Sequence, residues 1–399
     1  MKFKFNRKVL KNGMTLLFEK RNIPVVSVAF AVRYGGINEA PSEKGIAHFI
    51  EHMFYKGTPT RDTKKIAEEI EKNGGDLNGF TSETITAYWC KMPSKHLDVA
   101  LNVLSDMVKN PKFEKKELEK ERQVIFEEIK MYKDTPRLYV FDEIQKSLYD
   151  GTMGINLAGT FETLKSIDRD KMVGKFKEIY KPNNLILCVV GDANFEDIVK
   201  FAERNFGNEK GKIPIQKFNM KNEIKIEKRK GIDQANLVFA YHVPVSKDKK
   251  SDAAKILSTL MAGGMSSRLF DEIRVKRNLA YAFKGDAIIT RDFAYNFIYV
   301  GTSKENVEKV KEIILKEFEK VVKNLNEKEL KETKEQLIGN YYISMEDSQI
   351  QMVNLLSYEI EGNAKKFYEF EKNIKDVKLE DVKNLAKLKN YSFFALVPE

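Results

Sequence analysis

The chain has 399 residues, of which 42% are hydrophobic and 11% aromatic, so each of two domains has enough apolar material for a core. This composition excludes a wholly disordered chain. The net charge of +10 comes from 69 basic and 59 acidic residues that alternate along the chain, as on solvated helix faces, which argues against a nucleic-acid partner.

The N-terminal residues are partly basic but contain no long apolar run, so we expect no secretory signal. No stretch approaches the roughly 18 apolar residues that a membrane span needs, so we expect no membrane partner. Only Cys90 and Cys188 occur, each within an apolar run, as is typical of buried thiols in a reducing compartment. The expected location is the cytoplasm.

The first half of the sequence predicts alternating strands and helices that end before a loop-rich stretch. Its predicted elements are strands at 14–20 and 25–33, helices at 45–56 and 63–73, a strand pair at 76–81 and 83–91, helices at 94–109, 114–132, 136–149 and 168–180, a strand at 184–191 and a helix at 194–206.

Residues 207–222 contain Gly, Pro, Lys and Asn without a period and are the predicted linker. The order of elements then recurs in outline, which predicts an α+β fold of two similar domains, 1–215 and 216–399, each with helices on a mostly antiparallel sheet. The second set comprises strands at 223–229 and 235–242, helices at 248–262 and 267–276, strands at 281–290 and 293–301, long helices at 303–322 and 326–361, and a strand at 391–397.

Two of the four histidines lie within one predicted helical turn, as His48-x-x-Glu51-His52. Positions i and i+4 share a helix face, where two imidazoles can hold one zinc ion and Glu51 can reach a water bound to it. The alternative is a pair of exposed histidines on an amphipathic helix. Apolar residues flank the motif on most sides, so we expect the helix to be buried and the pair to need a partner.

A catalytic zinc site has three protein ligands, and the residues alone do not identify the third. His96 and His242 are candidates, as are many carboxylates. The predicted helix at 114–132 carries several glutamates, of which Glu121 and Glu128 are seven apart and lie on one face.

Four blocks of the sequence are distinctive, namely GIAHFIEHMFYKGT (45–58), NGGDLNGFTSETITAYW (73–89), EKERQVIFEEIKMYKDTP (119–136) and GGMSSRLFDEIRVKRNLAYAF (263–283). They resemble the pitrilysin-type inverzincin peptidases, the M16 family of insulin-degrading enzyme and the mitochondrial processing peptidase. The blocks are spread over both halves, so the resemblance covers essentially the whole chain, and the length of the chain resembles the bacterial two-domain branch.

The resemblance implies one Zn²⁺ per chain, held by His48, His52 and Glu128, which lies 76 positions after the second histidine. It implies that Glu121 orients a ligand histidine through a hydrogen bond. Glu127 is the weaker candidate for the third ligand. Glu51 is then the general base that takes a proton from the zinc-bound water.

The second and fourth blocks imply substrate contacts. In the family, the strand of the second block lies at a sheet edge and binds a peptide as an added strand, with Asn78, Phe80 and Thr81 lining the cleft. Gly79 departs from the alanine more often found there. Arg274 and Tyr281 match a pair that binds substrate near the scissile carbonyl. Judged without the resemblance, the second block is equally typical of a plain hairpin strand. Without it, Arg274 is more typical of a charged helix face and Tyr281 of a core aromatic.

The resemblance thus implies a zinc endopeptidase, a self-sufficient homodimer that cleaves peptides or unfolded segments in an enclosed chamber. One alternative is a catalytically silent peptide-binding or scaffold subunit of a peptidase-like complex, although such relatives typically lose motif residues that this chain keeps. Another is the S-ribosylhomocysteine lyases, which share H-x-x-E-H but are far shorter and use a cysteine ligand. Neither Cys90 nor Cys188 stands in a matching context.

Overall fold

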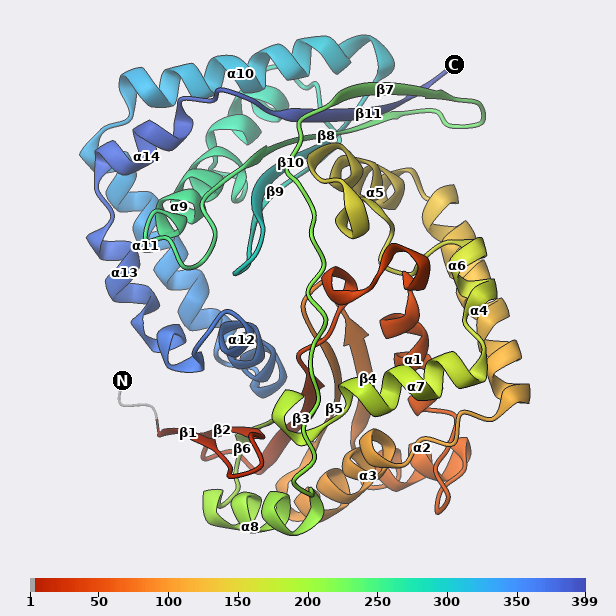
Figure 1. Ribbon diagram of the computed structural model, residues 1–399. Helices are drawn as coiled ribbons and strands as arrows, with labels where there is room; N and C mark the ends of the chain where they lie inside the picture. The colour runs from red at the N-terminus through yellow and green to blue at the C-terminus, as the bar shows by residue number, and fades with distance from the viewer. Residues whose placement is uncertain (1–3) are drawn as a thin grey trace. The chain divides into compact units, whose positions relative to one another are not determined.

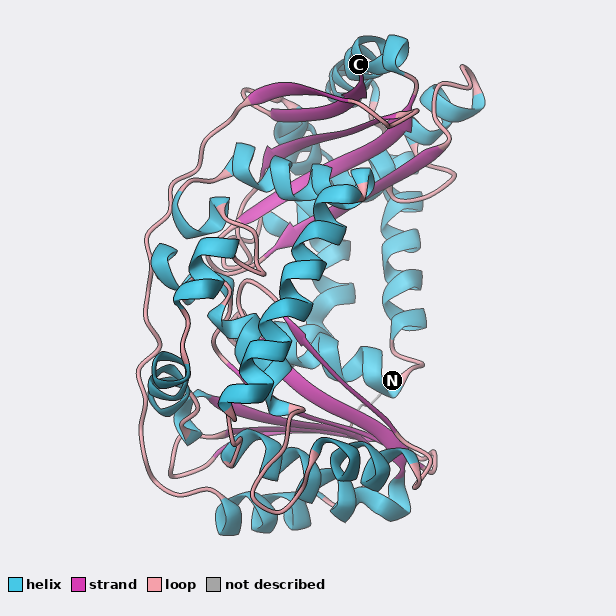
Figure 2. Cartoon of the chain, turned by 90° about the vertical axis from the view of Figure 1, so that its right-hand side faces the viewer, coloured by secondary structure: helices cyan, strands magenta, loops and turns pink. Residues whose placement is uncertain are grey.

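The computed structural model of the protein describes residues 4–399. Figure 2 shows two separate groups of strands with helices against them, and the chain's contacts divide it into two compact units. Unit 1 comprises Met1–Lys130, Ile155–Lys217 and Ser344–Phe367, and unit 2 comprises Met131–Gly154, Phe218–Ile343 and Tyr368–Glu399.

Unit 1 is built on a six-stranded sheet in the order β1-β2-β6-β3-β5-β4. Only the β2–β6 pair is parallel. The apolar runs of β3 and β6 become its buried central strands, as expected for strands covered on both faces. The strands are β1 (Phe5–Val9), β2 (Thr15–Lys20), β3 (Val25–Val32), β4 (Asp76–Thr81), β5 (Thr86–Pro93) and β6 (Leu185–Gly191).

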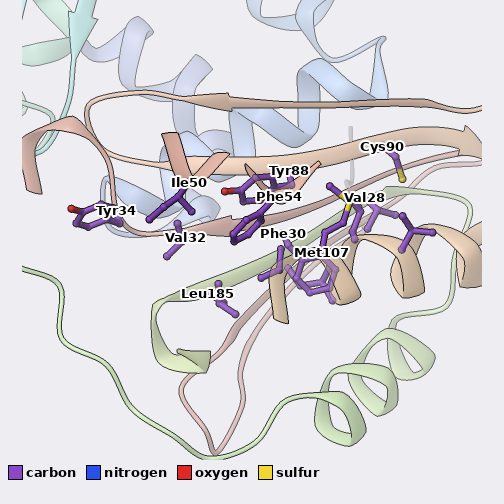
Figure 3. Close-up of a cluster of buried hydrophobic side chains, with 14 of the residues drawn as sticks. Val28, Phe30, Val32, Tyr34, Ile50, Phe54, Tyr88, Cys90, Met107 and Leu185 are labelled. Atoms are coloured by element: carbon purple, nitrogen blue, oxygen red, sulfur yellow. The ribbon is translucent and has the colours of Figure 1, made fainter. Parts of the chain in front are cut away.

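The core of unit 1 lies between this sheet and the helices packed on it (Figure 3). Phe30 of β3, Tyr88 of β5 and Phe54 of the first helix meet there, and the rings of Phe54 and Tyr88 stack with centroids 4.5 Å apart. The helices of this unit are α1 (Ile46–Phe54), α2 (Thr63–Glu71), α3 (Leu97–Lys109), α4 (Lys115–Asp134, in this unit as far as Lys130), α6 (Phe161–Ser166), α7 (Arg169–Ile179) and α8 (Phe195–Asn205).

Unit 2 is built on a five-stranded sheet in the order β7-β11-β8-β10-β9. Its strands are β7 (Ile224–Arg229), β8 (Ala235–His242), β9 (Ala282–Ile289), β10 (Ala294–Thr302) and β11 (Ser392–Pro398). Its later helices, visible in blue in Figure 1, complete the layer started by α9 (Ser251–Ala262). They are α10 (Val307–Asn324), α11 (Glu327–Ser344), α13 (Phe370–Asp376) and α14 (Leu379–Ala386).

The two sheets repeat one topology, which confirms the predicted α+β fold of two similar domains. In unit 1, β2 pairs in parallel with β6, and β3, β5 and β4 follow antiparallel. In unit 2, β7 pairs in parallel with β11, and β8, β10 and β9 follow antiparallel. Strand β1 is the additional edge strand of unit 1.

Each unit also contains one helix from the opposite half of the sequence. Helix α5 (Pro136–Leu148) packs on β8 and β11 of unit 2, and α12 (Ser348–Ile360) packs on β3 and β6 of unit 1. Each exchanged helix covers apolar sheet residues that would otherwise be exposed to water. The units therefore draw on both sequence halves, whereas the predicted division at 215/216 cuts the chain once.

The predicted helix at 326–361 is two helices, because Asp347 caps a new one. Its carboxylate accepts the backbone N–H groups of Gln349 and Ile350, which starts α12 at Ser348, four positions after α11 ends at Ser344. The short elements β1, α6, α13 and α14 were not predicted. Part of the predicted helix at 267–276 is a π-helix, Phe270–Val275. Among residues 4–399, no helix is both long and apolar enough to cross a lipid bilayer.

Candidate metal centre

Helix α1 carries the histidine motif, and a buried ion pair holds its first turn. Gly45 precedes the helix with φ of +95°, in the left-handed region that favours glycine. The Glu39 carboxylate accepts the backbone N–H groups of Gly45 at 3.1 Å and of Ala47 at 2.7 Å, which satisfies two donors of the helix start. The ammonium group of Lys44 lies 3.6 Å from Glu39, and both side chains are 0% exposed.

Three of the predicted ligands converge beside α1. His48 Nε2 and His52 Nε2 lie 3.2 Å apart. Glu128 of α4 places Oε2 3.7 Å from His48 Nε2 and Oε1 3.7 Å from His52 Nε2. Among residues 4–399, this is the one group of His, Cys, Asp or Glu side chains spaced to hold a metal ion.

The spacing of these atoms fits a tetrahedral zinc ion. Zinc bonds of about 2.0–2.2 Å at tetrahedral angles hold two ligand atoms roughly 3.3–3.5 Å apart, close to the separations observed here. Burial and the neighbouring His52 lower the pKa of His48 to about 3, so His48 is neutral near pH 7 and its ring lone pair is available. The side chains of His48, His52 and Glu128 therefore suit zinc, the metal that two histidines and a glutamate predict.

Glu121 and Lys56 set the orientation of His52. His52 Nδ1 lies 3.2 Å from Glu121 Oε2, which leaves Nε2 directed at Glu128. The ammonium of Lys56 binds the other oxygen of Glu121 at 2.7 Å. Burial lowers the pKa of His52, but the bond to Glu121 and the nearby carboxylates outweigh burial and raise it. A carboxylate behind a ligand histidine fixes its tautomer and ring direction.

Glu51 lies on the same helix, next to the cluster, and is 9% exposed. The hydroxyl of Thr81 donates a hydrogen bond of 3.1 Å to its Oε2. Burial raises the pKa of Glu51, against the opposing effects of His52 and Thr81. A carboxylate with a raised pKa beside a metal cluster suits proton transfer near neutral pH.

The other candidate ligands lie elsewhere. Glu127 is 70% exposed and pairs with Lys130 at 2.8 Å. His242 lies among aromatic rings of unit 2, with Nε2 3.0 Å from the carbonyl of Lys221. His96 ends a short 3-10 helix before α3 and belongs to no metal cluster. The alternatives that the residues alone left open therefore lack the geometry of the His48, His52 and Glu128 group.

Strand β4, which carries Asn78, Phe80 and Thr81, is the edge of the unit 1 sheet and pairs only with β5. Thr81 contacts Glu51, as described. Phe80 is half-buried, while Asn78 is exposed and accepts the N–H of Gly79 at 2.8 Å. The edge strand thus runs beside the cluster, and no second strand pairs with its outer edge among the described residues.

Arg274 and Tyr281 belong to unit 2. Arg274 is exposed at the end of the π-helix, with its guanidinium carbon 5.3 Å from the ring centroid of Phe270. Tyr281 is 46% exposed and donates its N–H to Gly301. Its ring packs on Gly301, where an added Cβ would come within 2.5 Å of the ring. Gly301 is therefore a residue that positions Tyr281.

The sequence reasoning missed Lys56, Glu39 and Lys44. Lys56 follows the motif by one helical turn from His52, so its i+4 spacing was a usable signal. Glu39 and Lys44 stand in an irregular loop of mixed charges and carried no periodic signal. Only the tertiary structure shows that both are buried.

Comparison with known proteins identifies relatives that match nearly the whole chain. Residues 15–160 match the family model for insulinase (peptidase family M16), and residues 166–337 match the one for the peptidase M16 inactive domain. An uncharacterized zinc protease of Bacillus subtilis is 33% identical over 390 residues, covering 96% of this chain and 94% of its own length. An uncharacterized zinc protease of Rickettsia felis is 31% identical over 403 residues, covering 97% and 95%.

Solved structures share the fold. A protease from Helicobacter pylori superposes with a TM-score of 0.92 at 22% identity, covering 99% of this chain and all of its own. A peptidase M16 inactive domain from Pseudomonas fluorescens gives 0.89 at 19% identity, covering 99% and 98%. With sequence relatives matching nearly end to end, the chain belongs to the M16 family of peptidases.

Proposed function

We propose that this protein is a zinc-dependent endopeptidase that cleaves peptides or unfolded protein segments. The observation that carries the proposal is the convergence of His48, His52 and Glu128 with Glu51 beside them on α1. The names of the curated relatives support zinc and proteolysis.

His48, His52 and Glu128 would hold one zinc ion per chain, and Glu121 would keep His52 directed at it. When bound, zinc polarises the scissile carbonyl and acidifies the attacking water. With two neutral imidazoles and one carboxylate as ligands, a bound Zn²⁺ ion would keep a net positive charge. That charge suits the carbonyl oxygen of a neutral amide substrate.

Glu51 would be the general base. It takes the proton of the attacking water and later delivers it to the leaving amine, so its protonation state is restored after each cycle. The hydrogen bond from Thr81 holds one carboxylate oxygen and limits rotation of the other. Its raised pKa brings the proton affinity of the base closer to neutral pH, where proton transfer is efficient.

Strand β4 would bind the substrate backbone by adding a strand at its open edge, with Asn78, Phe80 and Thr81 along it. That Arg274 and Tyr281 bind the substrate near the scissile carbonyl stays a prediction of the family resemblance. Their exposure in unit 2 leaves both donors available to a ligand. A homodimer with an enclosed chamber and a cytoplasmic location stay predictions.

The deciding experiment is Glu51→Gln, assayed with an internally quenched peptide. Gln keeps the size of Glu and a hydrogen-bond acceptor for Thr81 but does not take up a proton, so we expect kcat to fall by at least about 100-fold. Zinc content, measured by atomic emission on the purified protein, should stay at one per chain. Undiminished turnover would contradict the role of Glu51.

The second candidate is a scaffold subunit without activity, favoured by the description of the family model that matches residues 166–337. Zinc content and chelation separate the two. A peptidase should lose activity with a zinc chelator and regain it with added zinc. A purified protein that holds no zinc and ignores the chelator supports the scaffold instead.

A further inference from the structure

Tyr55 follows α1 directly and brings a buried hydroxyl next to the proposed active site. Its ring lies 6.4 Å from that of Tyr88, centroid to centroid, in the unit 1 core. The hydroxyl oxygen is inaccessible to solvent, and no hydrogen-bond partner meets it among residues 4–399. A buried donor without a partner costs free energy, so its presence calls for a reason.

Gly79 on β4 makes room for this hydroxyl. A Cβ at residue 79 would lie 2.4 Å from Tyr55 Oη, closer than nonbonded atoms approach. The same Cβ would lie 3.1 Å from Oε1 of Glu51. The hydroxyl and the carboxylate therefore border the same small space, which exists because residue 79 has no side chain.

The two oxygens of Glu51 have different surroundings. Oε2 accepts the Thr81 hydroxyl, whereas Oε1 faces the space beside Gly79 and Tyr55. A tyrosine hydroxyl both donates and accepts hydrogen bonds. It can donate to a carboxylate and accept from the carboxylic acid that forms once a base has taken a proton. Catalytic hydrogen bonds are often long in the free enzyme and shorten when substrate binds.

We propose that Tyr55 is a positioning residue for Glu51: its hydroxyl, admitted by Gly79, pairs with Oε1 and holds the carboxyl group in place. This inference rests on the proposed peptidase function. It also explains the glycine at position 79, since the methyl group of an alanine there would occupy the place of the Tyr55 hydroxyl.

The first test is Tyr55→Phe, which keeps the ring in the core and removes only the hydroxyl. We expect kcat on a quenched peptide to fall about tenfold, as for loss of one hydrogen bond to a charged group, with KM changed less than about twofold. Zinc content and Tm should not fall. A purely structural tyrosine would change Tm and leave kcat alone, so wild-type kcat in Tyr55→Phe overturns the inference.

The second test is a double-mutant cycle with Gly79→Ala, read by Tm because Gly79 lies in the strand proposed to bind substrate. Gly79→Ala alone should lower Tm, since the new methyl meets the hydroxyl. In the Tyr55→Phe background the same substitution should lower Tm much less, because the methyl fills the vacated space, while kcat stays low. Equal losses of Tm in both backgrounds would overturn the pairing of Gly79 with the hydroxyl.

Tyr34→Phe is the matched control. Tyr34 is also a buried tyrosine of unit 1 whose hydroxyl has no partner among the described residues, and it precedes α1, the helix that carries Glu51. We expect wild-type kcat in this variant, and a fall equal to that of Tyr55→Phe would overturn the specific role of Tyr55. A wild-type protein with no zinc-dependent cleavage would instead overturn the proposed function, and the positioning role of Tyr55 with it.

Discussion

His52 owes its orientation to a residue 69 positions further along the chain. The carboxylate of Glu121 lies 3.2 Å from His52 Nδ1 and is itself held by Lys56. The ligand geometry therefore depends on three linked side chains, from α1, from the turn that follows it and from α4, and only the histidine would touch the metal.

Replacing Glu121 by Ala should weaken zinc binding about 10- to 100-fold, the usual effect of removing a carboxylate behind a ligand histidine. The physical reason is that His52 loses its fixed tautomer and ring direction. Competition with a chromophoric chelator measures the change.

Glu127→Ala is the control for this substitution. Glu127 lies on the same helix but is exposed and paired only with Lys130, so zinc affinity should stay within about twofold of wild type. Similar losses in the two variants would show that Glu121 acts only through the stability of α4.

At the scale of elements, α12 is attached to the unit 1 sheet by buried polar contacts as well as by apolar packing. Ser348 and Ser27 share a hydrogen bond of 2.9 Å, and Gln351 donates to Glu19 at 2.7 Å. Near the end of the helix, Glu359 accepts hydrogen bonds from Arg7 and Arg33. Such contacts select one register of helix on sheet, which apolar packing alone specifies less sharply.

This attachment should depend on pH through Glu359. Burial raises the pKa of Glu359, but the hydrogen bonds from Arg7 and Arg33 outweigh burial and hold it below its usual value. A depressed carboxyl pKa stabilises the fold above the unfolded pKa of about 4.3, and this stabilisation is lost as the pH falls through the folded pKa.

Urea unfolding between about pH 6 and pH 3 tests this expectation. Glu359→Gln should lower the free energy of unfolding by about 2 kcal/mol at pH 6, where the ion pairs are intact. The difference between wild type and variant should shrink toward pH 3. A difference that stays constant across this range would contradict the assignment to Glu359.

At the scale of the molecule, the exchange of α5 and α12 makes each compact unit depend on both sequence halves. Without α12, the faces of β3 and β6 that it covers would meet water. Cutting the chain once between the halves therefore exposes apolar sheet surface that the full chain buries.

A fragment of residues 1–217 should accordingly fold poorly, with strong binding of a hydrophobic dye and no cooperative urea transition. Joining residues 344–367 to the fragment through a flexible linker supplies α12 and should restore cooperativity. If the bare fragment unfolds cooperatively with no excess dye binding, the first sequence half is an independent domain and α12 is an accessory to it.

Much of the fold and the centre of the site were predictable from local sequence. Short-range patterns indicate secondary structure without knowledge of the tertiary contacts. Such patterns are the apolar runs of β3 and β6, the helical period of α1 and the spacing of His48, Glu51 and His52. The resemblance to the M16 family added Glu128 and Glu121. The break at Asp347 was missed because a capping residue inside a long polar helix differs little from its neighbours.

The sequence by itself determined the elements and the residue types of a metal site, since both depend on neighbours within a few positions. The residues alone left open which glutamate of α4 faces His48 and His52, and the tertiary structure shows that it is Glu128. Only the tertiary structure decided that Lys56 supports Glu121 and that Gly79 leaves space for Tyr55. It also decided that α5 packs on the sheet of unit 2 and α12 on the sheet of unit 1. These features depend on contacts between residues far apart in the chain, where packing and burial choose among pairings that look equivalent in sequence.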